Sequence, residues 1–190
     1  MSKTFVTSVG REIKLAPVPQ MLVEKVRDAA LRSVAVPPAP TYEVKIGDGE
    51  TTATYYHDAT SVQTPEEKAA WDAYQAALAQ QNQAAAVRVM NFYYTRGIAE
   101  EMDEGWEAEQ RYFGVDIPED PIERKLHWVQ TELLVTPADF QNAIVAIMEA
   151  SGVDEEAIRA ARSSFRGDIR GEADAPGRTD RAVRPPKKGQ

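Results

Sequence analysis

The sequence contains no cysteine. This absence excludes disulfide bonds, thiolate nucleophiles, iron–sulfur clusters and zinc sites built from cysteine, and it is consistent with a reducing compartment. Long apolar runs are also missing, because none approaches the roughly 18 residues that a membrane-spanning helix needs. The N-terminal residues show neither the apolar segment nor the cleavage site of a signal peptide. We therefore expect a cytoplasmic protein that has no membrane partner.

Basic charge is scarce relative to acidic charge. The chain has 22 lysines and arginines against 30 aspartates and glutamates, which gives a formal net charge of −8. A protein with this balance is repelled by nucleic acid unless it carries a local basic patch, so no nucleic-acid partner is expected. The composition, 43% hydrophobic and 27% charged residues, is typical of a soluble globular protein. A chain of 190 residues suffices for one domain of ordinary size, or for one domain plus appendages.

Residues 1–63 predict a small ββαββ unit within an α+β fold. Residues 4–19 alternate in polarity around Gly10, a pattern typical of a β-hairpin. Residues 20–34 carry apolar side chains at helical spacing, and residues 41–58 alternate again around two glycines. We expect the two hairpins to form one small antiparallel sheet with the intervening helix on one face.

Residues 64–97 predict one long helix. Thr64, Pro65 and Glu67 stand at the N-cap, N1 and N3 positions of a capping box, and Gly97 fits the C′ position after the last turn. A helix of this length is a rod of about 48 Å. Its middle, AQQNQAAA, is polar and rich in alanine, so the rod would project from the domain, pack against another chain or break there into an α-hairpin. One continuous helix is the favoured prediction.

Residues 98–165 predict a compact helical region, and residues 166–190 predict a disordered basic tail. Helix start signals recur at Asp120 and at Thr136, each followed by proline. The tail has almost no large apolar side chain, and its seven basic residues against four acidic ones give it a net charge of +3. A segment of this composition does not bury enough apolar surface to fold.

An acidic run lies between the long helix and the helical region. It contains Glu100, Glu101, Asp103, Glu104 and Glu107. If the run is helical, Glu100, Asp103, Glu104 and Glu107 share one face. The spacing does not match a calcium-binding loop, and the E-x-x-H element of di-iron bundles is absent. Three interpretations stay open: a solvated face, which is favoured; a docking surface for a basic segment such as the C-terminal tail; and a metal site.

Neither histidine carries a catalytic motif. His57 follows a predicted strand and precedes Asp58, but no nucleophile or oxyanion hole accompanies this pair, so we expect an exposed histidine. His127 stands at the edge of an apolar helical stripe, where partial burial is expected.

Residues 47–50 contain two glycines but lack the lysine and the following helix of a phosphate-binding loop. They therefore predict a hairpin turn. No catalytic, cofactor-binding or metal-binding residue is assigned, and no cofactor is expected.

Five aromatic residues of the predicted long helix are candidates for a protein interface: Trp71, Tyr74, Phe92, Tyr93 and Tyr94. The last three are consecutive, so they point in three directions and do not all face one side of a core. Tyrosine is favoured where one end of the side chain is buried and the other is hydrated, as at protein interfaces. Core packing from two sides and an interface are both open.

Five segments, taken in their order along the chain, carry a resemblance to a known family: GREIKLAPVPQMLVEKVRDA, VPPAPTYEV, TPEEKAAWDAYQAALAQQNQ, EDPIERKLHWVQTELL and ASGVDEEAI. Together they resemble small proteins encoded among the tail genes of long-tailed bacteriophages, known as tail assembly chaperones or tail structural proteins. The resemblance covers about residues 9–160, and no catalytic motif carries it. It implies a non-enzymatic, mostly helical protein that binds other tail components, such as the tape measure protein or the tail tube protein.

Three functional hypotheses follow. The first, which the resemblance implies, is a non-enzymatic tail morphogenesis protein that acts by binding other proteins in the host cytoplasm, with a homo-oligomer left open. The second is a structural accessory protein that stays in the virion, in the tail or at the head–tail junction. The third and least favoured is a metal-dependent enzyme that uses the acidic run at residues 100–109 together with His127.

Overall fold

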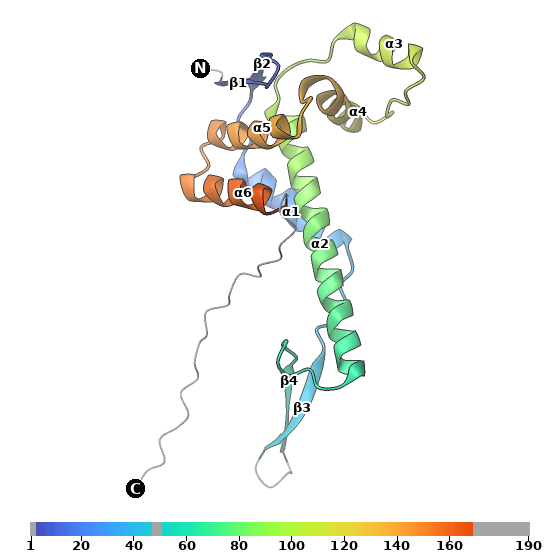
Figure 1. Cartoon of the computed structure of the whole chain (residues 1–190), viewed down its shortest axis with the longest axis vertical. Helices are drawn as coiled ribbons and strands as arrows, with labels where there is room; N and C mark the ends of the chain where they lie inside the picture. Colours follow the sequence, from blue (N-terminus) through green and yellow to red (C-terminus); the bar gives the residue numbers. More distant parts are fainter. Residues whose placement is uncertain (1–2, 47–50, 169–190) are drawn as a thin grey trace.

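The computed structural model describes residues 3–46 and 51–168, so the predicted turn at residues 47–50 and the predicted tail from residue 169 onward lie outside the described residues. The fold is α+β, with two small antiparallel sheets and a mainly helical remainder, which confirms the predicted class. One long helix, α2, forms the axis of the molecule (Figure 1). Several helices and one hairpin surround its C-terminal end, and a second hairpin lies at its N-terminal end.

The helix α2 (Pro65–Gly97) runs unbroken for 33 residues, as predicted, and is about 50 Å long. Its start has the expected capping box. The Thr64 side chain accepts a hydrogen bond from the Glu67 backbone N at 3.1 Å, and the Glu67 carboxylate accepts one from the Thr64 backbone N at 3.0 Å. The polar middle stays helical because alanine and glutamine are strong helix formers.

The end of α2 differs from the prediction. Gly97 is the last helical residue rather than a left-handed C′ residue, and the extended Ile98 follows it as the cap. Glycine is needed at this position for another reason, because a side chain would not fit there. A Cβ atom at Gly97 would lie 2.8 Å from Cδ1 and 2.9 Å from Cγ1 of Ile147, closer than carbon atoms approach without strain. Glycine therefore lets the end of α2 pack directly against helix α5, which carries Ile147.

The first hairpin, β1 (Lys3–Val6) and β2 (Glu12–Leu15), packs at the C-terminal end of α2. The alternation in β2 buries Ile13 and Leu15 and leaves the residues between them exposed. As the chain leaves α2, Ile98 forms an isolated antiparallel bridge with Leu15. The hairpin is thereby joined to the long helix by backbone hydrogen bonds as well as by apolar contacts.

We use the name head for the first hairpin, the C-terminal end of α2 and the helices that follow it. Those helices are α3 (Glu104–Tyr112), α4 (Pro121–Trp128) with a π-helical turn η1 (Val129–Leu133), α5 (Pro137–Ala150) and α6 (Glu155–Asp168). The start signals predicted at Asp120 and Thr136 are confirmed as N-caps. The helix α6 extends three residues past the predicted start of the tail. The largest fully buried side chains lie in or next to the head: Ile13, Val18, Ile98, Val129, Leu133, Leu134, Asp139 and Ile147.

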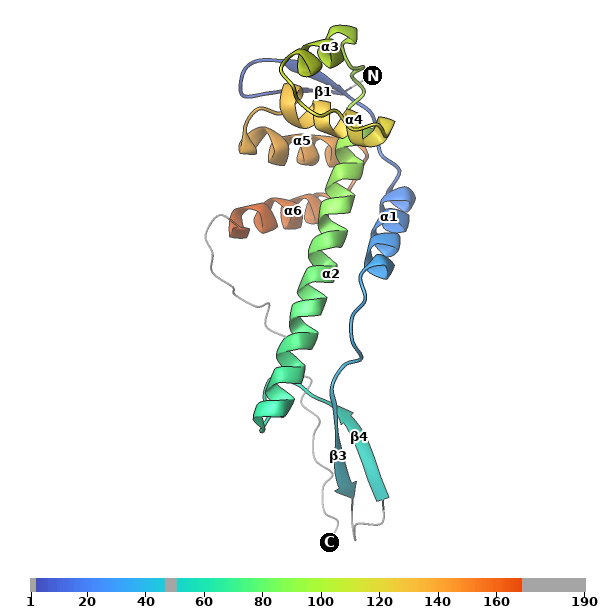
Figure 2. The same cartoon turned by 90° about the vertical axis from the view of Figure 1, so that its right-hand side faces the viewer.

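The helix α1 (Gln20–Ser33) lies alongside α2 (Figure 2) and buries Val23 and Ala30. A glutamine from the polar middle of α2 completes this contact. The Gln81 side-chain amide donates hydrogen bonds to the backbone oxygens of Leu31 at 2.7 Å and Val34 at 3.1 Å. These carbonyl groups stand at the end of α1, where helical partners are missing. One polar residue in the middle of α2, Gln81, is therefore explained by its contact with the end of α1.

Replacing Gln81 with alanine is expected to lower the free energy of unfolding by about 1 kcal/mol, since two carbonyl groups lose their donor. The matched control is Gln83→Ala, an exposed position on the same helix, where the same change in helix propensity acts without the loss of a contact. Urea denaturation followed by circular dichroism measures both. Equal midpoints for the two variants would contradict the assigned role of Gln81.

The second hairpin, β3 (Thr41–Ile46) and β4 (Thr51–Tyr56), forms its own two-stranded sheet. The expected single sheet of four strands is therefore wrong, although the elements follow one another in the predicted ββαββ order. The cause is the helix between the hairpins. It packs along α2 rather than on a sheet, and so it carries the chain away from the head toward the other end of α2 (Figure 2).

No helix within the described part of the chain combines the length and apolar character needed to cross a bilayer.

Candidate functional site

The described residues between 37 and 80, which we call the arm, lie at the end of the molecule opposite the head. The arm contains the hairpin β3–β4 and the first half of α2. The strand register places Tyr42, Val44 and their partners Tyr55 and Ala53 on one face of the hairpin. That face is apolar, yet Val44 and Tyr55 are 40% and 47% exposed. A hairpin with an uncovered apolar face is marginally stable alone.

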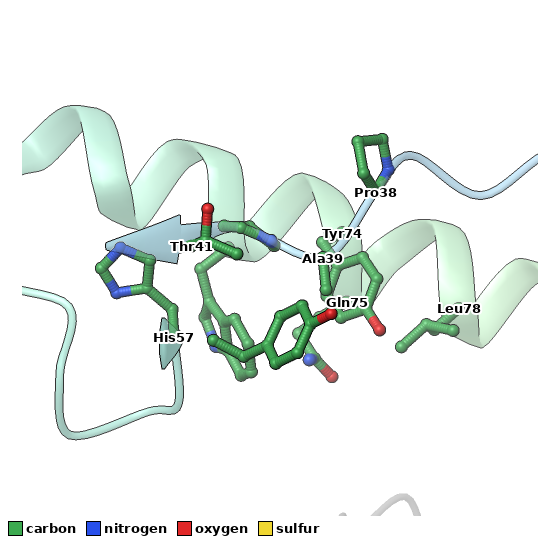
Figure 3. A pocket seen from close by; sticks show the side chains of 10 residues that line it. Pro38, Ala39, Thr41, His57, Tyr74, Gln75 and Leu78 are labelled. Carbon is green, nitrogen blue, oxygen red and sulfur yellow. The ribbon is translucent and has the colours of Figure 1, made fainter. Parts of the chain in front are cut away.

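An open hollow of about 1180 Å³ lies where the base of the hairpin meets α2 (Figure 3). We call it the aromatic hollow, because side chains with rings form most of its wall. Its lining residues are Pro38, Ala39, Pro40, Thr41, Tyr56, His57, Trp71, Tyr74, Gln75 and Leu78. They come from three segments: the proline-rich stretch before β3, the paired ends of β3 and β4, and one side of α2.

The wall formed by α2 follows from helical spacing. Trp71, Tyr74 and Leu78 stand one turn apart at i, i+3 and i+7, so they line one side of the helix. All three are half-buried, and the rings of Trp71 and Tyr74 lie 5.9 Å apart at an angle of 42°. Two of the five aromatic residues predicted for an interface thus lie side by side in the hollow.

His57 is buried, with 6% exposure, although the sequence predicts an exposed histidine at this strand end. Its ring lies 4.9 Å from the ring of Tyr42, and its Nδ1 lies 3.3 Å from the Ser61 hydroxyl. Its backbone N donates to the Pro40 oxygen at 2.9 Å, which holds the proline-rich stretch against the strand. The Tyr42 ring packs on the imidazole, and the pattern of a single sequence does not reveal a contact of this kind.

The neighbouring Asp58 does not form a catalytic pair with the histidine. Its carboxylate accepts hydrogen bonds from the side chain and backbone of Thr60 and from the backbone of Ser61. These bonds, that of the Thr60 hydroxyl first, lower the pKa of Asp58 to about 2. The carboxylate therefore stays ionised and shapes the turn that leads into α2.

The other three predicted interface residues lie in or beside the head. Tyr93 and Tyr94 are buried at 5% exposure each. The Tyr94 hydroxyl donates to the Phe140 backbone oxygen at 3.2 Å, and burial raises the pKa of this hydroxyl. Phe92 is half-buried in a smaller hollow that includes Val26 from α1. The three consecutive rings thus point in different directions, and two of them belong to the core.

The acidic run does not form the one-sided stripe that helical spacing would produce. The helix α3 begins only at Glu104, with Asp103 as its N-cap, so Glu100 lies outside it. Glu100 accepts a hydrogen bond from the backbone of β2, and Glu107 forms an ion pair with Arg124 at 2.9 Å. The side chain of Glu104 lies outside the described part of the structure. Within the described residues no cluster of three or more acidic or histidine side chains is arranged to hold a metal ion.

His127 presents a buried polar atom without a partner. Its Nε2 has no hydrogen-bond partner in the described structure, and its ring packs 5.8 Å from that of Trp106. The Trp106 indole N donates to Glu132 instead, at 3.2 Å. An unpaired buried nitrogen lowers stability, since it has lost its hydrogen bonds with water.

Replacing His127 with phenylalanine is expected to leave the free energy of unfolding unchanged or to raise it by about 1 kcal/mol. The new ring keeps the contact with Trp106 and removes the unpaired nitrogen. Thermal and urea unfolding at neutral pH provide the measurement. A clear loss of stability would show that the imidazole has a polar partner, and would contradict the assignment of His127 as unpaired.

Comparison with known proteins gives no match, whether with family models, with curated proteins or with solved structures.

Proposed function

We propose that this chain is a non-enzymatic bacteriophage tail morphogenesis protein, similar to tail assembly chaperones, that binds other tail proteins in the host cytoplasm. The observation that supports this proposal most is the arm, which holds a hairpin with an exposed apolar face and an open hollow lined by aromatic rings. The resemblance of the sequence to proteins of the tail gene cluster supplies the class of partner.

The hairpin of the arm lies away from the head (Figure 2). This hairpin is joined to the rest of the described chain mainly at one end, through the proline-rich stretch and the start of α2. Large apolar side chains remain exposed there, among them Val44, Ile46 and Tyr56. Exposed apolar surface of this kind marks sites of association, and aromatic anchors contribute most of the free energy at protein interfaces. A binding role explains why the chain keeps these residues.

The chemistry of the arm suits recognition of a peptide segment. Within the described residues each strand of the hairpin is paired with the other strand only, so an extended segment can add to either outer edge as a further strand. The aromatic hollow next to it can hold an apolar or proline-containing side chain. A chaperone for the tape measure protein, or for the tail tube protein, would cover its partner's apolar segments in this way until the tail assembles.

Co-expression with the tape measure protein tests the proposal. The wild-type chain is expected to increase the soluble fraction of the tape measure protein and to co-purify with it. The double variant Trp71→Ala/Tyr74→Ala should lose both effects. The matched control is Tyr112→Ala/Phe113→Ala, which removes two exposed aromatic rings of the head. Absence of binding by the wild-type chain to both the tape measure protein and the tail tube protein would overturn the proposal.

Mass spectrometry of purified phage particles separates an assembly role from a structural one. A chaperone is expected to be absent from the mature particle. Presence in fixed stoichiometry would instead favour the alternative, a structural accessory protein of the tail or the head–tail junction.

A further inference from the structure

The aromatic hollow has the features of a site for a proline-rich segment. Trp71 and Tyr74 form one wall, and Tyr56 stands at its edge with 74% exposure. Grooves lined by tryptophan and tyrosine bind proline-rich segments in the polyproline II conformation, because that conformation is preformed and exposes its rings. Two residues of such a helix advance about 6 Å, close to the 5.9 Å between the Trp71 and Tyr74 rings.

We propose that the occupant of this hollow is the chain's own C-terminal segment, residues 184–188, RPPKK. The sequence has two pairs of adjacent prolines. Of the first pair, Pro37–Pro38, only Pro38 lines the hollow, together with the nearby Pro40. The other, Pro185–Pro186, lies in the C-terminal segment and is available to enter it. This docking does not rest on the proposed tail-protein function, so it stands even if that function is rejected.

The charges of the two parts are complementary. From residue 37 to residue 80 the chain has seven acidic and two basic residues, a net charge of −5. From residue 169 to residue 190 it has six basic and three acidic residues, a net charge of +3. The proline pair is flanked by three of these basic residues. The exposed Glu66 and Asp72 belong to the first turns of α2, where Asp72 also pairs with Lys68 at 2.7 Å. Opposite charges of this kind attract across a Debye length of about 10 Å.

The C-terminal segment is long enough to reach the hollow of its own chain. The helix α6 ends at Asp168 and packs on α5 beside the C-terminal half of α2 (Figure 2). Residues 169–184 span at most about 58 Å when extended. The whole of α2 is about 50 Å long, and the hollow lies between its N-terminus and Leu78. Docking within one chain is therefore sterically open.

The exposure of Trp71 to a quencher tests the docking in the full-length protein. Trp106 and Trp128 are buried at 4% and 2% exposure, so acrylamide quenching of fluorescence reports mainly on Trp71. The double variant Pro185→Gly/Pro186→Gly is expected to raise the quenching constant about twofold over the wild type. Pro176→Gly is the matched control, a proline of the same segment outside RPPKK, and should have no effect. Equal constants for the wild type and the double variant would overturn the proposal.

Two further measurements identify the mode of docking. A synthetic peptide of residues 180–190, added to the double variant, should restore protection of Trp71 in a saturable manner, and high salt should weaken it. No restoration would show that the prolines act in another way and would overturn the proposal. The wild type should remain monomeric in light scattering while Trp71 is protected. Protection that appears only in a dimer would assign the segment to the hollow of a second copy and overturn docking within one chain.

Discussion

Replacing Asp139 with alanine is expected to lower the free energy of unfolding by about 3 kcal/mol, because the buried donors around it lose a charged acceptor. Asp139 is 1% exposed. Its carboxylate accepts hydrogen bonds from the backbone N and the hydroxyl of Ser8 at 2.7 and 2.8 Å, and from those of Thr136 at 3.2 and 2.8 Å. Thr136 caps α5, whereas Ser8 belongs to the turn of the first hairpin. One side chain thus caps a helix and joins it to the hairpin.

Glu67→Ala is the matched control for this variant. Glu67 holds the same N3 position in the capping box of α2, but its hydrogen bonds stay within the local cap, so its loss should destabilise the protein clearly less than the loss of Asp139. Asp139→Asn keeps one oxygen acceptor and should lie between the two. Urea denaturation gives all three values. A loss for Asp139→Ala no larger than that for Glu67→Ala would show that the bonds to Ser8 contribute nothing.

The pH dependence of stability checks the same site. Burial by itself would raise the pKa of Asp139, but the hydrogen bonds from Ser8 and Thr136 outweigh it and hold this pKa below the ordinary value of 3.8. The folded state therefore binds this proton less readily than the unfolded state. The stabilisation is complete above pH 3.8 and is lost as the pH falls through the folded pKa. The difference between the wild type and Asp139→Ala should shrink correspondingly below pH 4.

Replacing Gly97 with alanine is expected to lower the free energy of unfolding by about 2 kcal/mol, the usual cost of overpacking a core. The added methyl group would lie within 2.9 Å of Cγ1 and Cδ1 of Ile147, a side chain with no exposed surface. Either α5 moves away from the end of α2 or Ile147 leaves its preferred rotamer. Both changes disturb the centre of the head.

Gly105→Ala is the control for this prediction, since a Cβ there meets only the Asp103 carboxylate, at 3.4 Å. That variant should be neutral or slightly stabilising. A double-mutant cycle with Ile147→Ala gives the sharper result. Truncation of Ile147 removes the clashing atoms, so the double variant should be less destabilised than the sum of the single variants, by about 1 kcal/mol or more. Additive losses would contradict the assigned contact.

Local chemistry made several elements predictable. Thr64, Asp120 and Thr136 each combine an N-cap side chain with a following proline, and each starts a helix because both features act within four residues. The hairpins were predictable for the same reason, since alternation and turn residues are properties of short segments. The continuity of α2 followed from the absence of any helix breaker between Pro65 and Gly97.

Long-range packing decided what the sequence did not predict. The two hairpins form separate sheets because α1 packs on α2, a contact between segments that are distant in the chain. Gly97 matches a helix-ending signal, but its role is space for Ile147, fifty residues away. His57 is polar and follows a strand, yet the rings around it bury it.

The candidate site was predictable in part. Trp71 and Tyr74 stand out because two large aromatic rings occur one turn apart on a helix with a polar middle. Their neighbours in the hollow were not foreseen, since Pro38 and His57 reach it only through the fold of the arm. Tyr93 and Tyr94 are aromatic residues of α2, as Trp71 and Tyr74 are, but they lie in the core. Aromatic content alone does not separate an anchor for a partner from a core side chain.

Hydrogen exchange of the arm with and without the tape measure protein tests the central claim most directly. In the free protein the backbone amides of β3 and β4 should exchange quickly, because a two-stranded sheet with exposed faces opens readily. In the complex we expect their exchange to slow by about tenfold or more, together with protection of the segment around Trp71, while the amides of α5 are unchanged. Protection confined to the head, with the arm as exchangeable as before, would contradict the assignment of the arm as the binding surface.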